Sequence, residues 1–162
     1  MTSKRVVLMK EEYRMSKYRG FGFRVNCDER TFVEFLKKHK ASFDDELSAI
    51  FEYLTETEDR YMEREDVFEE YDYVSEESSH YGWPAAIANI MIMETGIRFG
   101  YYPGYGYKTQ GDYILFTETM PWYMNEKEHA LTSTSLREIM WKYAQELGVT
   151  ENIDYFTVDD GN

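Results

Sequence analysis

The apolar run at residues 85–93, AAIANIMIM, limits the possible folds more than any other stretch of this chain. Its apolar side chains fall on nearly every face of a helix, which is typical of a helix buried in a core. Pro84 suits the first turn of such a helix, and Gly96 is a natural stop. Periodicity also permits a buried strand over IANIMIM, so the helix is the favoured of two interpretations.

Alternating patterns predict strands on both sides of this run. Phe21, Phe23 and Val25 alternate with smaller or polar residues, as in a half-buried strand. Residues 5–10 form a second candidate strand, which would make a hairpin with 21–25 through a connection at 11–19. Residues 97–102 and 112–118 flank the glycine-rich PGYGYKTQG and predict another hairpin. Residues 153–158 are the last candidate strand.

Three further segments are predicted to be helical. One follows the capping residue Asp28, and a second starts at Ser42 and carries an apolar stripe over residues 47–54. A third opens with the capping box Ser135-x-x-Glu138 and ends at Gly148. The 162 residues suit one domain. We therefore expect a single α+β domain over 1–162, with a mixed or antiparallel sheet of about four to five strands and roughly three to five helices packed on it.

The stretch R-G-F-G-F at residues 19–23 matches the start of the signature octapeptide of RNA-recognition domains. In that fold a strand, a helix and another strand precede the octapeptide, but only 18 residues precede Arg19 here. Arg24 and Asn26 also break the rest of the pattern. The stretch therefore predicts an aromatic strand with small residues facing a neighbouring segment, and the basic N-terminal third remains a weaker candidate for a local binding patch.

Charge is distributed very unevenly. The whole chain has a formal net charge of −13. Residues 1–40 carry 11 basic and 5 acidic side chains, whereas residues 41–80 carry 2 basic and 15 acidic ones. Such asymmetry is informative about partners and solubility rather than about fold.

The most acidic segment is ETEDRYMEREDVFEEYDYVSEE, residues 56–77, with 11 acids and 2 arginines. As a helix it would carry about one net negative charge per 3.7 Å, close to the roughly 3.4 Å of a single nucleic-acid strand. Apolar residues at 61, 68 and 71 would dock it on the core with carboxylates outward. A solvated helix face or a mobile acidic loop is the plainer alternative. The predicted partner-binding residues are Glu58, Asp59, Glu63, Glu65, Asp66, Glu69, Glu70, Asp72, Glu76 and Glu77.

Catalytic and metal-binding patterns are weak. The single Cys27 excludes an internal disulfide and a cysteine-based zinc cluster, and the histidines at 39, 80 and 129 lack metal-ligand spacing. No calcium loop or phosphate-binding glycine loop is present in the sequence. We therefore predict no cofactor, no metal and no catalytic residue.

The hairpin at residues 99–113 is the alternative binding site. Tyr101, Tyr102, Tyr105 and Tyr107 crowd its glycine-rich turn and could stack on a nucleotide-like ligand. A hairpin whose tyrosines simply pack on the core is the structural alternative, and an unrecognised hydrolase is a third functional class.

The sequence shows no signal-peptide pattern and no run of about 20 apolar residues, so we expect a soluble cytoplasmic protein. Its size and acidity are typical of small inhibitors from phages and mobile elements that block nucleic-acid-binding defence enzymes. The leading hypothesis is a non-enzymatic inhibitor that engages a basic surface of a protein partner by nucleic-acid mimicry. Direct nucleic-acid binding is not expected, because the net charge opposes phosphate contacts.

Overall fold

The structure is a computed structural model that describes residues 17–56, 67–117 and 121–161. These ranges form a four-stranded antiparallel sheet, seven α-helices and two 3-10 helices, which confirms the α+β class. No helix in these ranges is long and apolar enough to cross a membrane. The strands are β1 (Lys17–Val25), β2 (Phe99–Gly104), β3 (Gly111–Phe116) and β4 (Asp154–Asp159). The helices are α2 (Glu29–Lys38), η1 (Lys40–Ser42), α3 (Asp45–Glu56), α5 (Val67–Val74), α6 (Trp83–Thr95), α7 (Gly106–Thr109), η2 (Pro121–Tyr123), α8 (Glu126–His129) and α9 (Ser133–Glu146).

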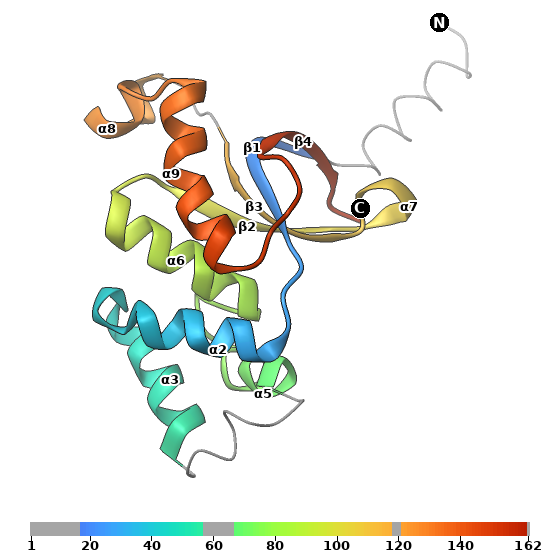
Figure 1. Ribbon diagram of the computed structural model, residues 1–162. Helices are drawn as coiled ribbons and strands as arrows, with labels where there is room; N and C mark the ends of the chain where they lie inside the picture. The colour runs from blue at the N-terminus through green and yellow to red at the C-terminus, as the bar shows by residue number, and fades with distance from the viewer. Residues whose placement is uncertain (1–16, 57–66, 118–120, 162) are drawn as a thin grey trace, which may run out of the picture.

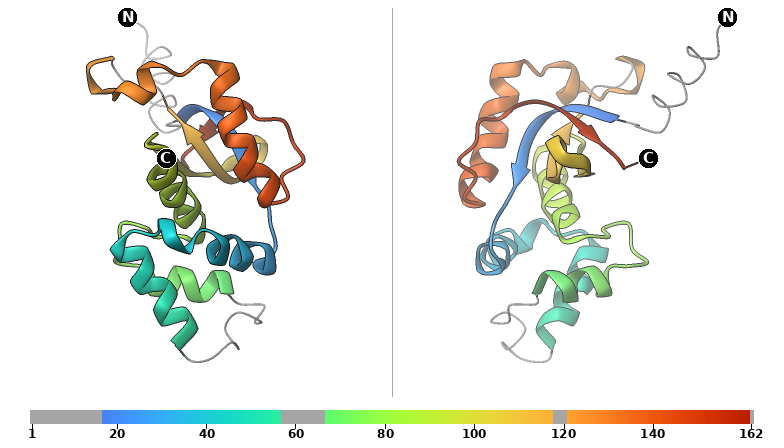
Figure 2. Two further views of the ribbon diagram at one scale, coloured as in Figure 1. Left: turned by 60° about the vertical axis from the view of Figure 1, so that its left-hand side comes forward. Right: turned by 90° about the vertical axis from the view of Figure 1, so that its right-hand side faces the viewer.

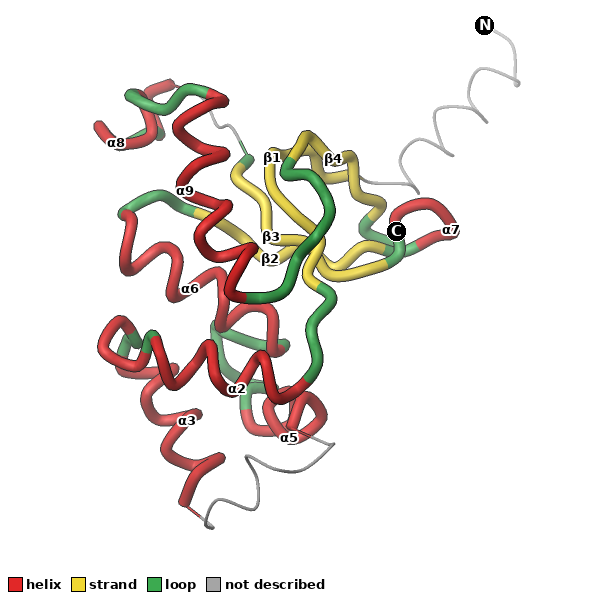
Figure 3. The backbone as a smooth tube through the Cα atoms, viewed as in Figure 1, coloured by secondary structure: helices red, strands yellow, loops and turns green. Residues whose placement is uncertain are grey.

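The sheet has the strand order β2-β3-β1-β4 (Figure 3). Phe21, Phe23 and Val25 of β1 are buried on one face, as their alternation predicts. The helices α6 and α9 lie against this face, whereas α3 and α5 gather at the end of the molecule away from the sheet (Figures 1 and 2). The hairpin of β2 and β3 is confirmed, with α7 inserted at its tip.

The predicted hairpin at the N-terminus is described only in its second strand, β1. Residues 5–10 lie outside the described residues, but β1 itself pairs with β3 over residues 21–25 and with β4 over residues 17–22. Lys17, Tyr18 and Arg19, expected in a connection, are the first residues of β1. Two strands from the second half of the chain flank β1, and Phe21 and Phe23 of β1 are buried in the main core cluster.

Two glycines let the strands approach each other closely. A Cβ atom on Gly22 would lie 1.9 Å from the backbone oxygen of Ile114, and one on Gly20 would lie 2.8 Å from that of Phe116. The prediction that R-G-F-G-F is an aromatic strand with small residues facing a neighbour is therefore confirmed. These two glycines allow the backbones of β1 and β3 to approach closely within the sheet.

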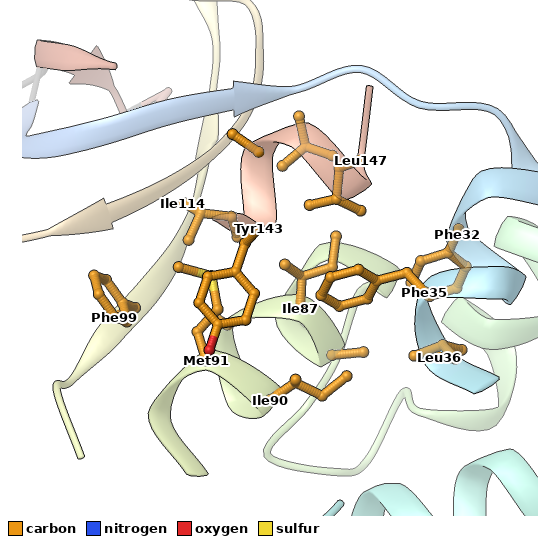
Figure 4. Packing of buried hydrophobic residues seen from close by; sticks show 14 of the residues in the cluster. Phe32, Phe35, Leu36, Ile87, Ile90, Met91, Phe99, Ile114, Tyr143 and Leu147 are labelled. Atoms are coloured by element: carbon orange, nitrogen blue, oxygen red, sulfur yellow. The ribbon is translucent and has the colours of Figure 1, made fainter. Parts of the chain in front are cut away.

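The run at residues 85–93 forms a buried helix, α6, as predicted. Pro84 stands in its first turn, and Gly96 ends it in the left-handed conformation with φ of 75°. Figure 4 shows Ile87, Ile90 and Met91 packed among side chains from α2, α9 and the sheet. All three are fully buried, which explains why this helix is apolar on nearly every face.

The predicted helices lie where the sequence indicates them, but some begin at a different residue from the predicted one. Asp28 caps α2 by accepting the Thr31 N–H at 2.8 Å, as expected. However, α3 begins at Asp45, and its cap is Asp44, whose carboxylate accepts the Leu47 N–H at 2.7 Å. Ser42 belongs to η1 and donates its hydroxyl to Glu94 instead.

The start of α9 differs in a similar way. Its cap is Thr132, which exchanges hydrogen bonds with Ser135. The predicted box of Ser135 with Glu138 therefore lies one turn too late. Threonine and serine both suit the capping position, so composition alone does not choose between them.

Candidate functional site

The end of the molecule formed by α3, α5 and residues 75–79 is acidic, and we call it the acidic lobe (Figures 1 and 2). In the described parts of residues 41–97 there are eleven aspartates and glutamates and no lysine or arginine. Arg60 and Arg64 lie outside the described residues. The exposed carboxylates of the lobe belong to Asp45, Glu46, Glu52, Glu69, Glu76 and Glu77.

The predicted partner-binding residues divide into two groups. Five of them lie outside the described residues: Glu58, Asp59, Glu63, Glu65 and Asp66. The other five are described. Glu69, Glu76 and Glu77 are exposed, whereas Glu70 and Asp72 are half-buried. The part of the predicted surface that the structure describes therefore consists mainly of the three exposed glutamates.

Asp72 has a structural role that its sequence context does not suggest. Its carboxylate accepts the backbone N–H of Trp83 at 2.9 Å, at the first turn of α6. Burial raises the pKa of Asp72, the Trp83 hydrogen bond opposes this, and the nearby charge of Asp112 adds to the increase. Asp72 is thus held by an intramolecular hydrogen bond, which makes it less available to a partner than the exposed glutamates.

Side-chain hydrogen bonds join α3 to the turn that follows α5. Glu46 Oε1 accepts the N–H of Ser79 at 2.6 Å and its hydroxyl at 2.9 Å, and these bonds lower the pKa of Glu46. His80 Nε2 lies 2.6 Å from Asp44 Oδ2. Burial alone would raise the pKa of Asp44, but its bonds to Leu47 and His80 lower it. These contacts hold the two sides of the acidic lobe together.

The other exposed carboxylates of the lobe differ from Glu46 in their surroundings. Among the residues that the structure describes, no lysine, arginine or histidine forms an ion pair with Asp45, Glu52, Glu69, Glu76 or Glu77. With respect to the described part of the chain, these carboxylates can therefore pair with cations of another molecule.

Exposed tyrosines accompany these carboxylates. Tyr53 of α3, Tyr73 of α5 and Tyr81 are 52%, 74% and 56% exposed. Tyrosine is enriched in protein interfaces because its ring offers a large contact area and its hydroxyl remains hydrated. Sequence reasoning missed these residues. Tyr53 could have been found, since it falls outside the apolar stripe of α3 formed by Leu47, Ile50 and Leu54.

The tyrosine hairpin does not form one site. Tyr101 is half-buried on the core side, and its hydroxyl donates to Asp112 at 2.6 Å. Tyr102 points to the other face of the sheet, where its ring lies 4.8 Å from that of Tyr18. Tyr107 of α7 is 99% exposed, and Tyr105 precedes that helix as its N-terminal cap. Adjacent strand residues face opposite sides, so the four rings cannot stack on one ligand.

Two cavities in the described part of the molecule are candidates for a catalytic site. One of about 550 Å³ lies between α9 and the start of β4, beside Trp141 and Ile153. The other, of about 470 Å³, lies between the sheet and the turn from α8 to α9 and includes Glu128 and His129. Glu128 forms an ion pair with the Arg98 guanidinium. The hydrogen bonds from Arg98 lower the pKa of Glu128 to about 2. It is therefore poorly suited to exchange protons near neutral pH.

Cys27 is also unsuited to nucleophilic chemistry. Burial and the neighbouring charge of Asp28 raise the pKa of its thiol to about 12, so the thiol stays protonated. Within the described ranges, no group of three or more histidine, cysteine, aspartate or glutamate side chains is arranged to hold a metal ion. The acidic lobe remains the best-defined candidate.

No known protein family, curated protein or solved structure matches the chain.

Proposed function

We propose that this chain is a non-enzymatic binding protein whose acidic lobe engages a basic, nucleic-acid-binding surface of a protein partner. The observation that supports this is the segregation of charge. Exposed carboxylates on α3, α5 and residues 76–77 lack cationic partners in the described ranges, and no described lysine or arginine interrupts them between residues 41 and 97.

A surface that binds nucleic acid presents lysines and arginines for phosphates, together with rings or guanidinium planes for bases. The acidic lobe offers complementary groups, since carboxylates can pair with the cations and the exposed rings of Tyr53 and Tyr73 can contact guanidinium planes. Such an interaction is steered by long-range attraction and weakens as salt screens it. By occupying that surface, the chain would inhibit nucleic-acid binding by its partner.

The test is affinity capture from a cell extract with the full chain immobilised. We expect basic proteins to be retained at low salt and released by added duplex DNA, because DNA and the acidic lobe would compete for one surface. The variant Glu69→Gln/Glu76→Gln/Glu77→Gln should lose these proteins.

A matched control removes the same charge elsewhere. Glu34, Glu126 and Glu138 are exposed and lie outside the lobe, so Glu34→Gln/Glu126→Gln/Glu138→Gln has the same net charge as the lobe variant. The control should retain the same proteins as the wild type. Equal retention by both variants, or retention that duplex DNA leaves unchanged, would show that the proposal is wrong.

A further inference from the structure

Three helices meet at their C-terminal ends around one histidine. His39 is the C-terminal cap of α2, Glu94 lies in the last turn of α6, and Glu146 is the last residue of α9. His39 Nδ1 lies 2.8 Å from Glu94 Oε2, and its Nε2 lies 2.5 Å from Glu146 Oε2. The side chain of His39 is only 10% exposed.

Both ring nitrogens of His39 must donate a proton in this arrangement. A neutral imidazole has one N–H and one lone pair, whereas each carboxylate oxygen can only accept. Only the imidazolium satisfies both contacts. A neutral ring would turn its lone pair toward one of the two carboxylates and repel it.

We propose that His39 is a pH-dependent clamp: as an imidazolium it joins the ends of α2, α6 and α9, and as a neutral ring it releases one of the two carboxylates. Helix C-termini carry partial negative charge, so three converging ends favour a cation between them. The device is independent of the proposed partner-binding function.

The groups that surround His39 on the neighbouring elements favour its charged form. From α9, Tyr143 donates its hydroxyl to Glu94 at 2.8 Å, and Ser42 of η1 donates to the same carboxylate at 2.5 Å. Lys38 donates to Glu146 at 2.8 Å. With a charged His39 the four ionic groups are neutral overall, whereas a neutral ring leaves one carboxylate uncompensated.

The pKa directions give the clamp a defined pH range. Burial lowers the pKa of His39, but the bonds to Glu146 and Glu94 outweigh it and raise the pKa above 6.5. Burial raises the pKa values of Glu94 and Glu146, but their hydrogen bonds lower both below 4.5. The histidine's contribution is therefore complete below pH 6.5 and is lost as pH rises through its folded pKa. The glutamates' contribution is complete above pH 4.5 and is lost as pH falls through their folded pKa values.

The first experiment titrates the histidine ring protons of the wild-type chain by NMR. His80→Gln and His129→Gln variants assign the three signals. We expect His39 to titrate with a midpoint above 6.5, and Glu146→Gln to shift this midpoint downward. A midpoint at or below 6.5 overturns the proposal, and the midpoint itself is measured on the wild-type chain.

The second experiment compares thermal unfolding at pH 6 and pH 9. Between these values the melting temperature of the wild type should fall by about 2–4 °C more than that of His39→Gln, which has no charge to lose. His129→Gln, altered at an exposed histidine of α8, is the control and should follow the wild type. If the melting temperatures of the wild type and His39→Gln fall by the same amount between pH 6 and pH 9, the clamp is refuted.

Discussion

Gly22→Ala is expected to destabilise the protein by about 3 kcal/mol or more, at the upper end of the cost of overpacking. The added Cβ would lie 1.9 Å from the carbonyl oxygen of Ile114 and 3.0 Å from the Cα atom of Leu115. Both are backbone atoms of β3, so no side-chain rotation relieves the clash. The strands β1 and β3 would have to separate in the middle of the sheet.

Urea denaturation measures this effect, and Gly148→Ala is a useful comparison. A Cβ on Gly148 meets no atom within 4 Å, although the residue has a φ of 71°. Its replacement should cost only the strain of a left-handed residue, about 1 kcal/mol. Equal stability of the two variants would mean that the close approach of β1 and β3 is not as described.

Glu128→Ala is expected to cost about 2–3 kcal/mol, since it removes hydrogen bonds to a buried charge. Glu128 is 3% exposed. Its carboxylate accepts from the Arg98 guanidinium at 2.7 Å and from the backbone N–H groups of Arg98 and Asn125 at 3.1 and 3.0 Å. Through these bonds it fastens α8 to the start of β2.

The pH dependence of this contribution distinguishes it from simple packing. The Arg98 hydrogen bonds lower the pKa of Glu128 from 4.5 to about 2. Its stabilisation is therefore complete above pH 4.5 and is lost as pH falls toward 2. Glu126→Ala, altered at an exposed residue of the same helix, should change the unfolding free energy by less than about 0.5 kcal/mol. A similar loss for both variants would contradict the assigned role.

The sequence predicted a helix, strand or hairpin correctly where the residues that determine it lie within one short segment. The helix α6 is bounded by Pro84 and Gly96, and the alternation in β1 is visible within five residues. The β2–β3 hairpin has glycines between two apolar runs. In each case the residues that decide the structure are neighbours in the sequence, so periodicity and turn chemistry are sufficient.

Contacts between distant segments were not predictable in this way. His39 and Glu146 are 107 residues apart, and Arg98 and Glu128 are 30 apart. The charge of Asp72 is evident in the sequence, but its hydrogen bond depends on the position of Trp83. The tyrosine hairpin is different: Tyr101 and Tyr102 are adjacent in a strand, so their opposite directions follow from the pleat alone.

The acidic lobe is best tested by a binding titration of one captured partner against three chains at the same low salt concentration. The chains are the wild type, Glu69→Gln/Glu76→Gln/Glu77→Gln and Glu34→Gln/Glu126→Gln/Glu138→Gln. If the lobe is the binding surface, the first variant should bind at least about tenfold more weakly than the wild type, a loss of about 1.4 kcal/mol. The second should bind within about twofold of the wild type. Equal weakening of both variants would assign the interaction to net charge alone, and no weakening of the first would place the binding surface elsewhere.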